Sequence, residues 1–118
     1  MTNGSERQSA TQSELGRERR AFPRYTFIAT AEMIERATET HITGRVSEIS
    51  RKGCFIDVFN TLPKGTVIQL RIATDKASFT SLGHIIYAQE RMGVGVAFDG
   101  PAADQQKVLD DWLTELSR

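Results

Sequence analysis

The stretch Met92-Gly93-Val94-Gly95-Val96-Ala97-Phe98 carries the clearest structural signal in the chain. Large apolar residues alternate in it with Gly and Ala, and a period of two predicts a β-strand with one face in a core. Pro101 then marks a change of period. The apolar side chains beyond it recur at helical spacing, which predicts an amphipathic helix over residues 102–117. Its apolar stripe consists of Val108, Leu109, Trp112, Leu113 and Leu116.

Five further strand-like segments precede this stretch. The first, over residues 25–33, alternates apolar and polar side chains. The others are expected at about residues 40–46, 54–58, 66–72 and 78–89, the last with a bend at Gly83. Closely spaced antiparallel strands in so short a chain favour a closed barrel, because closure removes exposed strand edges. We therefore expect an all-β fold, a six-stranded antiparallel β-barrel with a flanking C-terminal α-helix.

Size and charge set limits on what the protein can do. The chain has 118 residues, and its 15 basic and 15 acidic side chains cancel. This length fits one domain, which we expect over residues 15–118. Residues 1–14 are polar, so we expect a flexible tail there. A net charge of zero argues against binding of nucleic acid over the whole surface, and any anion site must be local.

Several classes of site lack support in the sequence. The single cysteine, Cys54, cannot form an internal disulfide and indicates a reducing compartment. No apolar run approaches the ~20 residues of a membrane span, and no signal-peptide core is present, so we expect a cytoplasmic protein. His41 and His84 have no partners at metal-ligand spacing. Without a nucleophile or phosphate-loop motif, we expect no metal site, no cofactor and no enzymatic activity.

Two polar segments are candidates for a binding site. Arg17-Glu18-Arg19-Arg20-Ala21-Phe22-Pro23-Arg24 precedes the first strand. A guanidinium group can bind phosphate oxygens, or the O6 and N7 edge of guanine, through two parallel hydrogen bonds. Glu48-Ile49-Ser50-Arg51-Lys52-Gly53 is expected to be a loop at the barrel rim. Gly53 would permit positive φ or a close backbone approach. Taken singly, a solvated basic linker and a plain turn remain the alternatives.

In their order and spacing the two segments resemble the signature of the PilZ domain family. That signature is R-x-x-x-R followed by (Asp/Asn)-x-Ser-x-x-Gly. Here it reads Arg20-Ala21-Phe22-Pro23-Arg24 and Glu48-Ile49-Ser50-Arg51-Lys52-Gly53. The turn Leu62-Pro63-Lys64-Gly65-Thr66 and the stretch Gly93–Phe98 before a final helix are also similar to the family. The resemblance covers about residues 15–118.

The resemblance implies a non-enzymatic bacterial receptor for the second messenger cyclic di-GMP. Arg20 and Arg24 would hold the ligand phosphates and guanine edges, with Arg19 as an auxiliary contact. Ser50 and Gly53 would meet the other guanine and the backbone beside it. The tail before Arg20 would fold over the ligand, so that binding changes what a downstream protein partner can contact.

Glu48 departs from the family pattern, which has Asp or Asn at that position. A glutamate still accepts N–H bonds from guanine, but its oxygens sit one methylene further out. Two other functions therefore stay open. One is a PilZ-like adaptor that acts by protein contacts without a ligand. The other is a small nucleic-acid-binding barrel, although the expected line of aromatic residues among basic ones is missing. Tyr87 would either stack on a base or pack within the fold.

Overall fold

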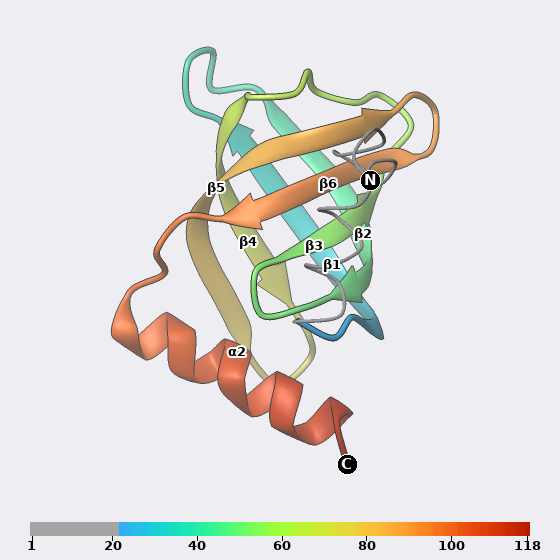
Figure 1. The fold of residues 1–118 in the computed structure, drawn as a ribbon. Coiled ribbons are helices and arrows are strands. Elements are labelled where there is room, and N and C mark those ends of the chain that lie inside the picture. Colours follow the sequence, from blue (N-terminus) through green and yellow to red (C-terminus); the bar gives the residue numbers. More distant parts are fainter. Residues whose placement is uncertain (1–21) are drawn as a thin grey trace, which may run out of the picture.

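The computed structural model describes residues 22–118, which form six β-strands and one helix (Figure 1). In chain order these are β1 (Tyr25–Glu35), β2 (His41–Ile49), β3 (Gly53–Asp57), β4 (Val67–Ala73), β5 (Ser78–Gln89), β6 (Gly93–Phe98) and α2 (Ala103–Leu116). The strands close into a barrel in the order β1-β2-β3-β6-β5-β4, and all neighbouring pairs are antiparallel. The predicted six-stranded barrel with a C-terminal helix is confirmed.

The barrel interior is filled by side chains from alternate positions of the strands, as a period of two requires. The largest fully buried side chains are Phe79, Met33, Ile49, Ile56, Ile68, Leu70, Ile72, Ile85, Leu109, Val46, Val94 and Val96. Complete burial of one such side chain contributes roughly 1.5–3 kcal/mol to folding. Because this interior is packed with apolar groups, a polar ligand must bind on the outside of the barrel.

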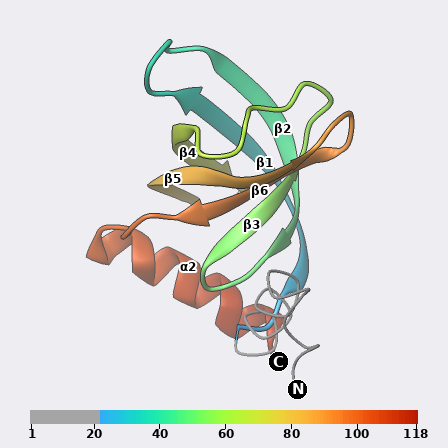
Figure 2. The same ribbon diagram turned by 45° about the horizontal axis from the view of Figure 1, so that its top comes forward.

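Helix α2 runs along one end of the barrel (Figures 1 and 2). Leu109 is its one buried residue, and the rest of the predicted apolar stripe packs on the barrel core. The Trp112 ring lies 5.0 Å from that of Phe27 and 6.3 Å from that of Phe79, measured between centroids. The helix thus covers an opening of the barrel with aromatic and aliphatic groups. No helix within residues 22–118 is both long and apolar enough to cross a membrane.

Strand β2 is longer than predicted and takes up part of the expected loop. It ends at Ile49, whereas the sequence pattern suggests an end near Val46. Glu48 is therefore a strand residue, aligned with Thr26 of β1 and with Phe55 of β3. The sequence misleads here because pairing on both sides holds the backbone of β2 in a strand even where its side chains are polar. A register shift between Val46 and Glu48 accompanies the extension.

Strand β5 joins two parts of the barrel wall. Its residues 78–84 pair with β4 and its residues 83–89 pair with β6. Its register with β6 shifts between Ile85 and Tyr87, and its pairing passes from β4 to β6 at residues 83–84, where the sequence predicts a bend. Gly83 is also a point of close approach, because a Cβ atom there would lie 2.7 Å from the carbonyl oxygen of Ala97. Strand β6 consequently lies between β3 and β5 on one face (Figure 1).

Candidate ligand-binding groove

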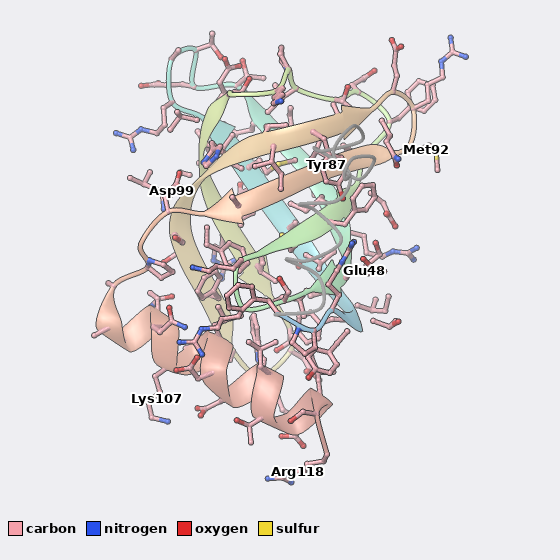
Figure 3. All side chains as sticks on the ribbon, viewed as in Figure 1. Glu48, Tyr87, Met92, Asp99, Lys107 and Arg118 are labelled. Carbon is pink, nitrogen blue, oxygen red and sulfur yellow. The ribbon has the colours of Figure 1, made fainter. Side chains whose placement is uncertain are left out.

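A groove of about 370 Å³ crosses the outer surface of the barrel over β3, β6 and β5. Its walls also include the turn between β2 and β3 and the residues just before β1. In Figure 3 Glu48 lies on the right of this face and Asp99 on the left, while Tyr87 projects from β5 between them. We refer to this feature as the groove.

The surface is hollowed along β6 because its outward positions carry Gly and Ala in place of larger side chains. A Cβ atom at Gly95 would lie 2.5 Å from the ring of Tyr87, and one at Gly93 would lie 2.6 Å from the ring of Phe55. The two rings stack on each other with centroids 6.0 Å apart. The glycines therefore make room for an aromatic pair that spans β6. Tyr87 packs within the fold and also lines the groove.

Arg24 and Glu48 form an ion pair on one side of the groove. Nη2 of Arg24, just before β1, donates a hydrogen bond to Oε1 of Glu48 on β2. The alignment of Thr26 with Glu48 across the two strands brings the side chains together. The Arg24 side chain is 30% exposed and that of Glu48 is 44% exposed, so both remain accessible from solvent.

Ser50 and Gly53 shape the turn that follows β2. The Ser50 hydroxyl oxygen accepts hydrogen bonds from the backbone N–H groups of Lys52, at 3.2 Å, and Gly53, at 3.3 Å. Gly53 does not have the positive φ that the sequence allowed. It is needed because a Cβ atom there would lie 2.1 Å from the carbonyl oxygen of Val96 on β6. Both residues thus place the turn beside the groove floor.

Lys52 adds a second cation to this side of the groove. Its Nζ atom lies 5.3 Å from the centre of the Phe22 ring, within the range of a cation–π contact. Its carbonyl oxygen accepts a hydrogen bond from the backbone N–H of Phe98, which ties the turn to the end of β6. The groove thereby presents cationic, aromatic and hydrogen-bonding groups together.

His84 and Asp99 form the other polar pair in the groove. Nδ1 of His84 on β5 lies 3.0 Å from both carboxylate oxygens of Asp99, which follows β6. The backbone N–H of Asp99 donates to the carbonyl oxygen of Leu82, so the acid is anchored to β5. No motif in the sequence predicts this pair, because it depends on β5 lying next to β6 in the barrel.

A family model for the PilZ domain matches residues 18–115. The chain belongs to the PilZ domain family. The family is one of receptors for cyclic di-GMP. No curated protein sequence matches this PilZ domain.

Three solved structures resemble this PilZ domain in fold. The PilZ domain of CeSA from a cellulose-synthesizing bacterium has a TM-score of 0.62 at 16% identity, covering 80% of this chain and 98% of its own. The PilZ domain of YcgR from Escherichia coli, solved with cyclic di-GMP, has a TM-score of 0.68 at 14% identity, covering 85% and 92%. The Bacillus subtilis inhibitor of motility MotI/DgrA has a TM-score of 0.68 at 12% identity, covering 80% of this chain and 49% of its own.

Four of the six residues predicted to bind ligand in this PilZ domain meet in the groove. They are Arg24, Glu48, Ser50 and Gly53, and they come from segments that are distant in sequence. The other two, Arg19 and Arg20, lie outside the described residues, as does the tail predicted over residues 1–14. Sequence reasoning assigned no role to Lys52, His84 or Asp99.

The remaining chemistry of the PilZ domain is limited within residues 22–118. No group of three or more His, Cys, Asp or Glu side chains there is arranged to hold a metal ion. Cys54 is buried at the start of β3, and desolvation raises the pKa of its thiol far above the ordinary value. A thiol held in its neutral form is a poor nucleophile, so Cys54 acts as a small apolar core residue.

Proposed function

We propose that this PilZ domain is a non-enzymatic receptor that binds cyclic di-GMP in the groove. The observation that carries the proposal is the meeting of Arg24, Glu48, Ser50 and Gly53 around one groove. In the family signature these positions belong to two motifs, and the described residues of both, Arg24 from the first and Glu48, Ser50 and Gly53 from the second, line the same face. Membership in a family of cyclic di-GMP receptors supports the same conclusion.

The cations would supply the binding energy for the phosphates. The Arg24 guanidinium presents a planar fork of donors that matches two phosphate oxygens, or O6 and N7 of guanine. Lys52 offers a point charge beside it. Arg20, with Arg19 as an auxiliary contact, would complete the set from the segment before Phe22. The ligand is an anion, so this local concentration of positive charge also attracts it from solution.

The aromatic pair would receive a base. The stacked rings of Phe55 and Tyr87 stand over the glycines of β6 and line the groove. A purine placed against such a ring gains about 1–3 kcal/mol from stacking, judged by replacement with alanine in other proteins. Ser50 and Gly53 would place the backbone of the turn against the second base.

Ligand binding requires Arg24 to exchange one partner for another. In the free protein its guanidinium is bonded to Glu48, and a phosphate has to compete with that carboxylate. The segment before Arg24 would fold over the bound ligand at the same time. This change of order would present a different surface to a downstream protein partner, which is how a receptor without catalytic activity passes on its signal.

Calorimetric titration tests the proposal. Cyclic di-GMP is titrated into the full chain, with cyclic di-AMP and GMP as control ligands, and the titration is repeated with the double variant Arg20→Ala/Arg24→Ala. We expect heat of binding for cyclic di-GMP with the wild type and at least a tenfold loss of affinity in the variant, because two charge-assisted contacts are removed. Absence of heat with the wild type refutes the proposed function. Equal affinity of the variant refutes the assigned site.

The Arg24–Glu48 pair also favours a second candidate function. An arginine that is already paired can serve only to hold the start of β1 against β2. Such a structural role would suit a PilZ adaptor that acts through protein contacts alone. In that case Arg24→Ala lowers the midpoint of thermal unfolding, while cyclic di-GMP leaves that midpoint unchanged in both proteins. A ligand-dependent rise in the midpoint, seen in the wild type only, contradicts the adaptor hypothesis.

A further inference from the structure

The groove carries two acid–base pairs, and the proposed function uses only one of them. Arg24 and Glu48 form the first, on the side of β2. His84 on β5 and Asp99 just after β6 form the second, and Asp99 lies across this face from Glu48 in Figure 3. Cyclic di-GMP has two guanine bases, and each needs its own partners. The second pair is therefore a candidate hydrogen-bonding partner for the second base.

The contact with Asp99 decides which nitrogen of His84 carries the hydrogen. A carboxylate can only accept, so Nδ1 of His84 must be the donor in the 3.0 Å contacts. In the neutral imidazole the other nitrogen, Nε2, then holds a free lone pair. Nε2 has no hydrogen-bond partner among residues 22–118. The pair therefore offers the groove a fixed acceptor.

On the other side of the groove, part of the acceptor capacity is already in use, which leaves mainly the second carboxylate oxygen of Glu48 for a guanine. Oε1 of Glu48 is taken by Arg24, and the Ser50 hydroxyl oxygen already accepts from two backbone N–H groups. Guanine presents an N1–H and an exocyclic amino group on its Watson–Crick edge, and both must find acceptors once they leave water. The His84–Asp99 pair supplies Nε2 and the remaining lone pairs of a carboxylate. The side chains are 40% and 42% exposed and so can be reached.

The surroundings of His84 leave its ring accessible. Its neighbour across the β5–β6 ladder is Ala97, whose methyl group is too small to cover an imidazole. Ala97 itself lines the groove. The carboxylate of Asp99 holds the ring from one side, and the backbone bond from Asp99 to Leu82 fixes the acid. Because both side chains are already held in place, they lose little conformational entropy when a ligand binds.

We propose that the His84–Asp99 pair recognises the second guanine of the ligand, with Nε2 of His84 accepting a hydrogen bond from N1–H or the amino group. This inference rests on the proposed function and adds base specificity to it. Adenine bound in the same orientation has a lone pair at N1 and no amino group at C2, so neither donor that Nε2 meets on guanine is present. A site built around a directed hydrogen bond rejects a ligand that cannot form it. The pair thus selects for a ligand with two guanines.

The test uses cyclic GMP–AMP, which retains the 3′,5′ linkages of cyclic di-GMP and differs in having one guanine replaced by adenine. Its affinity and that of cyclic di-GMP are measured by calorimetry in buffer above the pH range in which histidines usually titrate. We expect the wild type to bind cyclic di-GMP about tenfold more tightly, since one hydrogen bond is lost and one acceptor is left unpaired. In His84→Ala the preference should fall to within about twofold of unity.

Asp99→Asn provides a second variant that keeps the size of the side chain. Its amide can donate to Nδ1, which would move the ring hydrogen to Nε2 and turn the acceptor into a donor. We expect Asp99→Asn to lose the preference for cyclic di-GMP as well. His41→Ala and Glu32→Gln are matched controls, because His41 and Glu32 form a similar pair outside the groove, at 3.4 Å. Both controls should keep the wild-type preference.

The outcomes separate this inference from the proposed function. If the wild type does not bind cyclic di-GMP, both are wrong. Suppose instead that the wild type binds both ligands equally well, or that His84→Ala and Asp99→Asn keep the full preference for cyclic di-GMP. The groove then binds cyclic di-GMP, but His84 does not recognise a base. A purely structural role for the pair is revealed by variants that unfold at lower temperature and weaken both ligands by the same factor.

Discussion

Replacement of Glu48 by aspartate is expected to tighten the binding of cyclic di-GMP. The substitution keeps the negative charge and withdraws the carboxylate by one C–C bond, about 1.5 Å. The ion pair with Arg24 would then be stretched or lost, and the guanidinium would be free for a phosphate. Aspartate is also the residue that the family signature has at this position. Glu48→Asn should tighten binding too, because it removes the competing charge.

The size of the effect follows from the exposure of the pair. With side chains 30% and 44% exposed, the Arg24–Glu48 bond is a surface ion pair, worth about 0.2–1 kcal/mol. A tenfold change in affinity corresponds to about 1.4 kcal/mol, so release of Arg24 should strengthen binding by about 1.4- to 5-fold. The ratio of the two affinities should fall towards one as salt is added, because salt screens the ion pair.

Calorimetry on the wild type, Glu48→Asp and Glu115→Asp measures this effect. Glu115 lies on the exposed side of α2 and outside the groove, so Glu115→Asp is the same substitution away from the ligand site. Its affinity for cyclic di-GMP should match that of the wild type. Weaker binding by Glu48→Asp would show that the glutamate contacts the ligand better than an aspartate can. In that case the interpretation of Glu48 as a competitor for Arg24 is wrong.

Three predictions concern the scaffold. Gly53→Ala should lower the free energy of unfolding in urea by about 1–3 kcal/mol, because its Cβ atom would lie 2.1 Å from the Val96 carbonyl oxygen. An unchanged midpoint of unfolding would show that β3 and β6 can move apart without loss of stability. Leu109→Ala should cost about 2–5 kcal/mol, since it empties the fully buried contact of α2, whereas the exposed Lys107→Ala should change stability little. Burial raises the pKa of Cys54, so its thiol should resist alkylation until the protein unfolds. The free energy of unfolding should fall as pH rises above the ordinary thiol pKa of 9.0, because the Cys54 thiol then ionises only in the unfolded chain. Cys54→Ala should lack this contribution to the fall.

The fold could be predicted from the sequence because its elements have distinct periods. Alternation in β6 and helical spacing in α2 are local signals, and they predict the bounds of both elements to within one residue. The end of β2 lies beyond the predicted one, because Glu48 pairs with both β1 and β3, whereas Ser47 falls at the register shift between Val46 and Glu48. Burial of backbone hydrogen bonds between two neighbours is a tertiary effect that no local pattern contains.

The candidate site could be predicted only in part for a similar reason. The two motifs that contain Arg24 and Ser50 are visible as sequence, and folding brings both to the groove. His84, Asp99 and the Phe55–Tyr87 pair form no motif. They meet because β6 lies between β3 and β5, an order that the sequence pattern leaves open. The small residues of β6 were the one available hint, since alternating glycines on an outer face signal a close approach.

NMR mapping of cyclic di-GMP on the folded chain tests whether the groove is the binding site. Cyclic di-GMP is added to isotope-labelled protein, and the backbone amide signals are followed by NMR. We expect the largest shifts at amides around the groove, such as those of Ser50, Gly53, Gly95 and Asp99, while those of β4 stay nearly unchanged. A spectrum that does not respond to the ligand, or shifts concentrated on β4, would contradict this expectation.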